Sequence, residues 1–208
     1  MSDFPIQGSE EWLAQRMGKV TASRIADMMA KTKSGWGASR ANYAAQLVAE
    51  RLTGQPGETF TNAAMTWGTE TEPQARAAYE FYSGLPVAEV GFITHPIISQ
   101  SGASPDGLVG DSGLVEIKCP NTATHIETLL GGSVPAKYNY QMQWQLACTN
   151  RAWCDWVSFD PRMPESMRLF TKRVMRDSAL LGELETEIKA FLAEIDETVS
   201  RLTKTYAA

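Results

Sequence analysis

Hydrophobic residues recur every three or four positions near the end of the chain, between Ser178 and Tyr206. This spacing places them on one face of a long amphipathic helix. Capping residues and terminating glycines mark further helices upstream. The predicted helices cover residues 9–17, 22–30, 39–54, 62–83, 123–130, 136–149 and 178–206. Because Pro73 falls in one of them, we expect it near a helix start or at a kink.

Apolar residues alternate with polar ones in the middle of the chain, which predicts strands. Within residues 114–119, the apolar Val115 and Ile117 share one face of a strand. Glu116 and Lys118 share the opposite face. The predicted strands cover residues 87–94, 102–109, 114–119, 152–159 and 168–175. This order of elements predicts an α/β fold with a mixed central β-sheet flanked by helices, in one domain spanning residues 1–208.

The composition is that of a soluble globular protein, with 43% hydrophobic and 21% charged residues. No apolar run is long enough to span a membrane, and no signal peptide opens the chain. The three cysteines lack the paired spacing of a zinc site, so we interpret them as reduced thiols. We interpret His95 and His125 as structural or surface residues. These features predict a cytoplasmic protein with no membrane partner.

The charge is unevenly distributed, which matters more than the net charge of −5. Six basic residues and one acid lie between Gln15 and Arg40, whereas seven acids and one base lie between Asp177 and Glu197. This pattern predicts that the N-terminal stretch meets phosphates while the acidic C-terminal helix faces elsewhere. The alternative is that both are ordinary solvated surfaces.

One segment carries candidate chemistry. Asp106 follows Pro105, and glycines further along allow the chain to turn back toward Glu116 and Lys118. A hairpin would therefore place Asp106 beside these two residues. Two carboxylates can hold Mg²⁺ through oxygen, and an ammonium can stabilise the charge that develops on a phosphodiester. The alternative is an exposed ion pair without function.

The residues around this segment resemble the PD-(D/E)XK nuclease superfamily, and within it the phage lambda exonuclease family of alkaline exonucleases and viral recombinase nucleases. The resemblance begins with 104–108 and 114–120. Further matching residues occur in the same order along the chain: Trp12, Arg16, Gly18, Thr21, Ala22 and Ser23; Trp67, Gly68 and Glu72; Gly131, Gly132, Tyr140, Gln141 and Gln143; and 159–163. The resemblance implies a restriction-endonuclease-like core.

The resemblance also implies roles for residues around the hairpin. Asp106, Glu116 and the backbone carbonyl of Ile117 would hold Mg²⁺, with Mn²⁺ as a substitute. Lys118 would position or activate water. Glu72 would support the catalytic group, because its spacing from Trp67–Gly68 matches the family better than that of Glu70.

Four residues would bind a terminal 5′-phosphate according to the resemblance: Arg16, Ser23, Ser104 and Gln141. Gln145 lies one helical turn from Gln141, so either glutamine could face the site.

Two residues would contact DNA. Met65 corresponds to an apolar wedge that splits the terminal base pair, although a buried methionine is the alternative. Lys33 corresponds to a duplex-binding arginine. Nearby family lysines are replaced by 35–37, Gly-Trp-Gly, which weakens the expected grip on the duplex.

The resulting hypothesis is a Mg²⁺-dependent 5′→3′ exonuclease acting on double-stranded DNA ends. It would release 5′-mononucleotides and leave 3′ overhangs for homologous recombination by strand annealing. The resemblance further implies a ring-shaped homotrimer and a single-strand annealing recombinase as partner. The alternatives are an endonuclease on the same fold and a catalytically silent DNA-binding or assembly protein.

Overall fold

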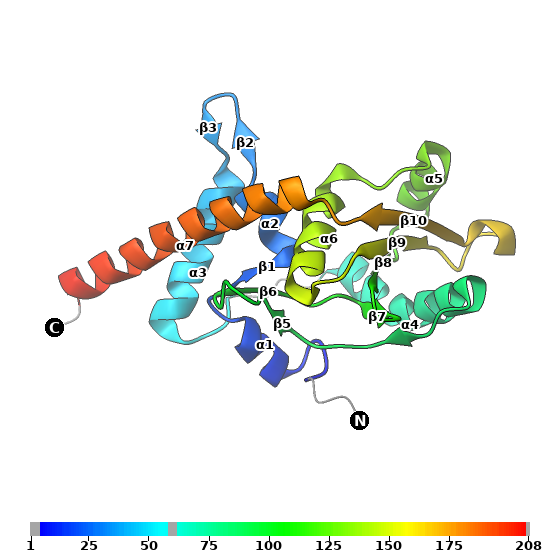
Figure 1. The fold of residues 1–208 in the computed structure, drawn as a ribbon, viewed down its shortest axis with the longest axis horizontal. Helices are drawn as coiled ribbons and strands as arrows, with labels where there is room; N and C mark the ends of the chain where they lie inside the picture. The colour runs from blue at the N-terminus through cyan, green and yellow to red at the C-terminus, as the bar shows by residue number, and fades with distance from the viewer. Residues whose placement is uncertain (1–4, 58–61, 207–208) are drawn as a thin grey trace.

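A five-stranded mixed sheet organises one half of the molecule (Figure 1). The computed structural model describes residues 5–57 and 62–206. The strand order is β10-β9-β8-β7-β4, and only the β8–β9 pair is parallel. The strands are β4 (Val87–Ala88), β7 (Gly107–Val109), β8 (Gly113–Lys118), β9 (Trp153–Phe159) and β10 (Leu169–Met175). Two helices, α5 (Thr122–Gly131) and α6 (Ala136–Thr149), form the crossover that a parallel pair requires.

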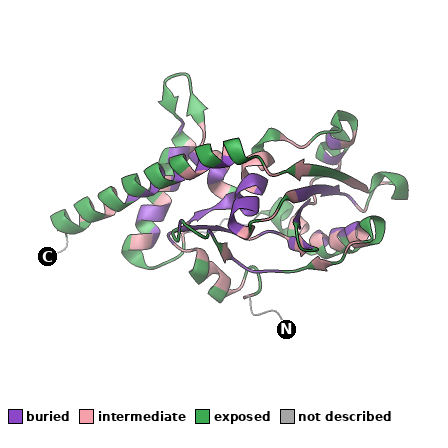
Figure 2. Cartoon of the chain, in the orientation of Figure 1, coloured by how far each residue is buried: buried purple, intermediate pink, exposed green. Residues whose placement is uncertain are grey.

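Helices cover both faces of this sheet. On one face, Val115 and Ile117 pack with Tyr79 of α4 (Ala63–Ser83). On the other, Leu114 packs with Met142 and Leu146 of α6. The alternation read from the sequence is therefore confirmed, as is the mixed α/β fold class. Figure 2 shows the resulting burial along β8, β9 and α6.

A second, three-stranded sheet of order β1-β6-β5 lies in the other half of the molecule. Its strands are β1 (Val20–Thr21), β5 (Ile93–Thr94) and β6 (Ser101–Ala103). Gly102 sits where a Cβ atom would lie 2.3 Å from the Phe92 ring and 2.6 Å from the Ile93 carbonyl oxygen. Only glycine therefore fits at this position. The largest hydrophobic cluster packs around this sheet and includes the fully buried Trp144 and Phe191.

Several helices complete this half: α1 (Glu10–Arg16), the 3₁₀ helix η1 (Ala22–Arg24), α2 (Ile25–Met28), α3 (Ala38–Thr53) and α7 (Ser178–Tyr206). Ser9 caps α1 by accepting a hydrogen bond from the Trp12 N–H, as its position in the sequence predicts. The bounds of α7 also match the prediction. The final turns of α7 extend beyond the rest of the molecule and are exposed (Figures 1 and 2).

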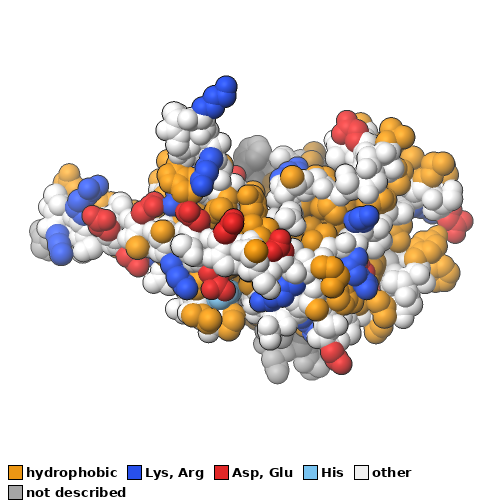
Figure 3. All heavy atoms as spheres, turned by 45° about the horizontal axis from the view of Figure 1, so that its top comes forward, with side chains coloured by type: hydrophobic (Ala, Val, Ile, Leu, Met, Phe, Trp, Pro, Cys, Tyr) orange, Lys and Arg blue, Asp and Glu red, His pale blue; other side chains and the backbone are white. Residues whose placement is uncertain are grey.

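The acidic helix does not face away from the basic stretch, which corrects the charge prediction. The guanidinium of Arg40 is buried and lies 2.8 Å from a carboxylate oxygen of Glu194 on α7. Arg51 of α3 pairs in the same way with Asp196. Acidic side chains are nevertheless visible along the outer face of α7 in Figure 3. Arg40 is therefore part of the α3–α7 packing.

Three predicted elements are divided in the structure. Residues 22–30 form η1 and the short α2, in place of one helix. Residues 87–94 contribute β4 to the large sheet and β5 to the small one, and 102–109 contribute β6 and β7 in the same way. Pro105 lies at the second break, and proline lacks the N–H that would continue a strand ladder. This break puts Asp106 immediately before β7.

Pro73 lies inside α4 without ending the helix, which excludes the predicted position near a helix start and leaves the predicted kink. The carbonyl of Thr69, four residues earlier, consequently has no helical N–H donor at that position. The three cysteines are free thiols, of which Cys148 and Cys154 are buried, as predicted. Within the described ranges, no helix has the length and apolar character needed to cross a membrane.

A small hairpin projects from the half of the molecule that holds the small sheet (Figure 1). It consists of β2 (Lys31–Thr32) and β3 (Gly35–Trp36), and Lys33 lies at its tip. The exposed Trp36 ring has the Lys31 ammonium 4.7 Å from its centroid and the Arg40 guanidinium 4.0 Å from it. Basic side chains stand out on this hairpin in Figure 3.

Candidate active site

The β7–β8 hairpin brings the predicted aspartate and glutamate together. Gly107 pairs with Val115, so Asp106 lies across from Glu116. Oδ2 of Asp106 accepts a hydrogen bond of 2.6 Å from the backbone N–H of Ile117. The N–H and C=O of one strand residue point toward the same neighbouring strand. The Ile117 carbonyl therefore also faces the side on which Asp106 lies.

Glu116 is fully buried and receives three side-chain donors. The Lys118 ammonium lies 2.5 Å from Oε1. Gln141 donates to the same oxygen at 2.6 Å, and Gln145 donates to Oε2 at 2.5 Å. Both glutamines therefore contact a predicted metal ligand. The sequence left open which of the two glutamines faces the site. Because they lie one helical turn apart, both reach Glu116.

The charges in this cluster shift one another's pKa values. Burial and the neighbouring Glu116 carboxylate raise the pKa of Asp106 well above its usual range. Burial alone lowers the pKa of Lys118, but the carboxylates of Glu116 and Asp106 outweigh it and raise that pKa. The lysine is therefore a cation at neutral pH. As a cation it is suited to stabilising negative charge.

Glu72 belongs to the same electrostatic group from the side of α4. Burial raises its pKa, against the opposing effect of the Arg76 guanidinium. Oε1 of Glu72 lies 2.7 Å from Arg76, which also pairs with Glu89 at 2.7 Å. Glu70, the competing acid, is exposed. A cavity of about 620 Å³ opens beside these groups, and Glu72, Arg76 and Asp106 line it.

The donor set fits a hard divalent cation. Among residues 5–57 and 62–206, no three His, Cys, Asp or Glu side chains form a ready-made metal cluster. Asp106 and Glu116 nevertheless offer carboxylate oxygens side by side, and Ile117 offers a carbonyl oxygen. Such oxygen ligands suit Mg²⁺ or Mn²⁺. The raised pKa of Asp106 reflects first its burial and then repulsion from Glu116, and a bound cation would offset both.

A second group of predicted residues lies around Ser104, which precedes Asp106 by two residues in the sequence. The hydroxyl of Ser104 accepts hydrogen bonds from Trp12 Nε1 at 3.0 Å and from Arg16 Nη1 at 3.3 Å. The Arg16 guanidinium also lies over the Trp12 ring, 3.9 Å from its centroid. Two of the four predicted phosphate ligands are thus in contact. Trp12, to which the family resemblance gave no role, contacts both of them.

The remaining predicted residues lie apart from this contact. Ser23 is exposed on η1. Lys33 is exposed at the hairpin tip. Met65 is 54% exposed in the first turn of α4, so its interpretation as a buried methionine is wrong.

Comparison with known proteins identifies the family. Residues 11–152 match the YqaJ-like viral recombinase domain. The chain belongs to this family. The prediction of a viral recombinase nuclease family is therefore confirmed. No curated protein sequence matches the chain.

Solved structures agree with this YqaJ-like assignment. The alkaline exonuclease LHK-Exo from Laribacter hongkongensis is 55% identical, with a TM-score of 0.89 over 96% of this chain and 98% of that chain. LHK-Exo in complex with dAMP gives a TM-score of 0.90 at the same identity and coverage. A phage related exonuclease from Haemophilus somnus 129PT is 16% identical, with a TM-score of 0.70 over 88% of this chain and 96% of that chain. This last likeness shows the fold alone.

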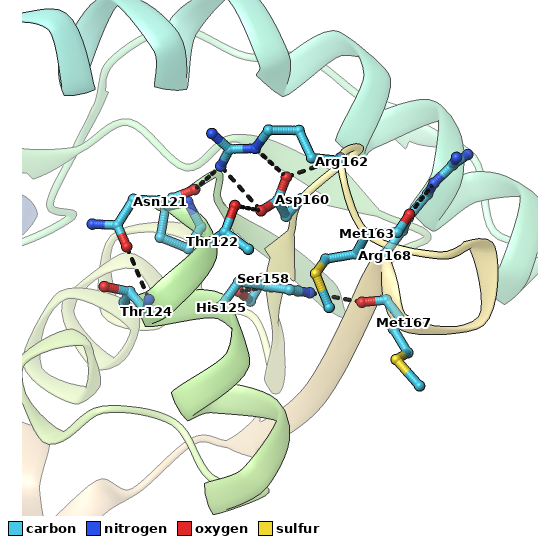
Figure 4. Close-up of polar contacts among 11 residues, drawn as sticks. Asn121, Thr122, Thr124, His125, Ser158, Asp160, Arg162, Met163, Met167 and Arg168 are labelled. Atoms are coloured by element: carbon cyan, nitrogen blue, oxygen red, sulfur yellow. Dashed lines mark hydrogen bonds and ion pairs between the residues drawn. The ribbon is translucent and has the colours of Figure 1, made fainter.

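A polar network fastens the end of β8 in this YqaJ-like chain (Figure 4). The buried Asp160 accepts hydrogen bonds from Arg162 Nε at 2.7 Å and from Thr122 Oγ1 at 2.6 Å. Burial alone raises the pKa of Asp160, but these hydrogen bonds outweigh it and lower the pKa to about 2. Arg162 also donates to the carbonyl of Pro120 at 3.3 Å and lies over the Trp67 ring, 4.4 Å from its centroid.

The same network gives a structural role to Asp160 and Arg162, two of the matched residues 159–163, whose role the sequence leaves open. It joins the segment after Lys118 to the end of β9 and to the first turns of α4. His125 reinforces this region from α5, since its two ring nitrogens bond to the Ser158 hydroxyl at 2.7 Å and to the Met167 carbonyl at 2.8 Å. His125 is thus a structural residue, as predicted.

Proposed function

We propose that this chain is a divalent-cation-dependent exonuclease that digests one strand of duplex DNA from its 5′ end. The observation that carries the proposal is the cluster of the half-buried Asp106 and Lys118 around the fully buried Glu116, at the start of β7 and along β8. In this cluster, two carboxylates that can bind a metal ion lie beside the ammonium group of Lys118. This is the chemistry that phosphodiester hydrolysis needs.

The relatives support the choice of an exonuclease. LHK-Exo, at 55% identity over nearly the whole of both chains, is described as an alkaline exonuclease. It also has a structure in complex with dAMP. A deoxynucleoside monophosphate is the product that an exonuclease releases when it hydrolyses DNA one nucleotide at a time. We therefore propose 5′-mononucleotides as products here.

Each residue of the cluster has a role in the proposed reaction. Asp106, Glu116 and the Ile117 carbonyl would hold Mg²⁺, or Mn²⁺ in its place. The bound cation would polarise the phosphate and lower the pKa of a water molecule. Lys118, kept protonated by its neighbours, would orient that water and stabilise charge on the phosphoryl oxygens. Glu72 would support the site from α4.

End recognition would come from the adjacent group around Ser104. Arg16 can form charge-assisted hydrogen bonds with a phosphate. It contacts Ser104, which precedes Asp106 by two residues, so its guanidinium lies near the proposed cation site. Ser23 and Gln141 would complete the 5′-phosphate site. Anchoring the strand end at a fixed distance from the cation selects one scissile bond, which makes cleavage exonucleolytic. Lys33 and Met65 would contact the duplex beyond it.

Three further parts of the proposal rest on the family resemblance. Digestion of one strand would leave a 3′ single-stranded overhang, which is the substrate for recombination by strand annealing. A single-strand annealing recombinase would be the partner that receives this overhang. A homotrimeric ring would enclose the duplex.

The test uses linear and closed circular duplex DNA, with Mg²⁺ or with EDTA. The proposal predicts loss of linear DNA only, only with the cation, and release of label from the 5′ end before the 3′ end. Cutting of circles would instead indicate an endonuclease. Binding of DNA without cleavage under all cation conditions would indicate a DNA-binding or assembly protein.

A further inference from the structure

We propose that Gln145 is a positioning residue that fixes the carboxylate of Glu116 for cation binding. The inference rests on the proposed function, in which Glu116 is a metal ligand. Gln145 lies in the middle of α6 and is fully buried. Its Nε2 donates to Oε2 of Glu116 at 2.5 Å.

The hydrogen bonds to Glu116 can be counted against what a carboxylate accepts. Its two oxygens offer about four lone-pair positions in total. Lys118 and Gln141 both donate to Oε1, whereas Gln145 donates to Oε2. One position, on Oε2, remains beyond these three contacts. Gln145 therefore sets the rotation of the carboxylate group and with it the direction of the remaining lone pair.

The orientation of the amide shows that Glu116 dictates it. With Nε2 on Glu116, the buried Oε1 of Gln145 has no hydrogen-bond partner among the described residues. A buried unpaired carbonyl oxygen is unfavourable, so the donor contact to the carboxylate outweighs it. Gln145 itself is fully buried, so no solvent is available to its amide as an alternative partner. The donor is thus held rigidly against Glu116.

Gln143 provides a matched comparison on the same helix. It is equally buried, but its Nε2 donates to the Met175 carbonyl at 2.8 Å and its Oε1 accepts from the Asp177 N–H at 2.9 Å. Both ends of this amide therefore bond to the backbone between β10 and α7. Gln143 contributes to folding without touching Glu116.

The experiment measures Mn²⁺ binding to the full chain by isothermal titration calorimetry, without DNA, together with thermal melting. Gln145→Met keeps the volume and removes the donor, and Gln143→Met is its control. Loss of a residue that orients a metal ligand typically costs about 10–100-fold in metal affinity. We expect a loss in that range for Gln145→Met. Gln143→Met should melt at a lower temperature and, while folded, bind Mn²⁺ as the wild type does.

Two outcomes separate the inference from the proposed function. If the wild type binds Mn²⁺ and folded Gln145→Met binds it within about threefold, the inference is wrong while the proposed function stands. If the wild type neither binds Mn²⁺ nor cleaves linear DNA, the proposed function fails. Gln145→Asn keeps an amide but shortens its reach, so it should show the same loss of affinity. It replaces the methionine variant if that variant does not fold.

Discussion

Lys118 and Glu116 form an ion pair on the same face of β8, with Nζ 2.5 Å from Oε1. The glutamate is fully buried, so the lysine offsets a charge that water does not reach. The same ammonium is held next to the position where the proposed reaction builds negative charge. One side chain thus serves both the resting protein and the chemical step.

Lys118→Ala should remove cleavage while leaving binding to DNA ends largely intact. Loss of a group that stabilises transition-state charge commonly lowers the rate by about 10²–10³-fold. The measurement is the rate of nucleotide release from linear duplex, with end binding followed by fluorescence anisotropy. Thermal melting must show that the variant is folded, because the buried Glu116 carboxylate loses its ion pair with the Lys118 ammonium. Cleavage within a few-fold of wild type would refute the assigned role.

Asp106→Asn and Glu116→Gln should each weaken Mg²⁺ binding sharply, because each removes one charge while keeping the shape of the side chain. Calorimetric titration of Mg²⁺ in the presence of DNA measures the effect. Asp111→Asn is the control, since Asp111 is an exposed acid in the turn of the same hairpin. Unchanged affinity in both site variants would mean that any cation binds elsewhere.

Metal-free protein should lose stability as the pH rises, owing to Asp106. Because its pKa is raised in the folded state, the unfolded chain releases this proton first, at about pH 4. Between that pH and the raised folded pKa, the free energy of unfolding falls with increasing pH. Asp106→Asn removes this loss, so it should melt higher than wild type at pH 7.

Thermal scans in EDTA between pH 4 and pH 8 test this expectation. For a protein of this size, each kcal/mol shifts the melting temperature by about 2–4 °C. The difference between Asp106→Asn and wild type should shrink as the pH approaches 4. Mn²⁺ should raise the melting temperature of wild type and not that of the variant. A variant that melts below wild type at every pH would contradict the expected repulsion between carboxylates.

Arg16→Ala should slow digestion of 5′-phosphorylated duplex much more than digestion of 5′-hydroxyl duplex. Hydrogen bonds between charged groups contribute about 1.5–3 kcal/mol, and only the phosphorylated end would receive them from Arg16. The two rates should therefore converge in the variant, as measured with matched substrates. Lys31→Ala, an exposed base of the same stretch, should lower both rates together. If both variants behave alike, Arg16 belongs to a general basic surface. Arg40 is unsuitable as a control, because it is buried against Glu194.

The parts of the site that depend on local chain geometry could be predicted from the sequence. Strand alternation and a short turn are enough to bring Asp106 beside Glu116. The long apolar period from Ser178 to Tyr206 likewise defines α7. Prediction failed where distant segments decide the outcome. The role of Gln145 depends on how α6 crosses the sheet, and the burial of Arg40 depends on where α7 docks.

The dependence of Glu116 on two amides from α6 has a consequence for the order in which the protein matures. A nascent chain that has folded only through β8 has both carboxylates but lacks the donors that hold one of them in place. Those donors arrive with the same helix whose Trp144 bonds to Ser101 at 2.9 Å and joins the largest hydrophobic cluster, which α7 then completes. The fixed orientation of the Glu116 carboxylate is thereby tied to the docking of α6 on the sheet.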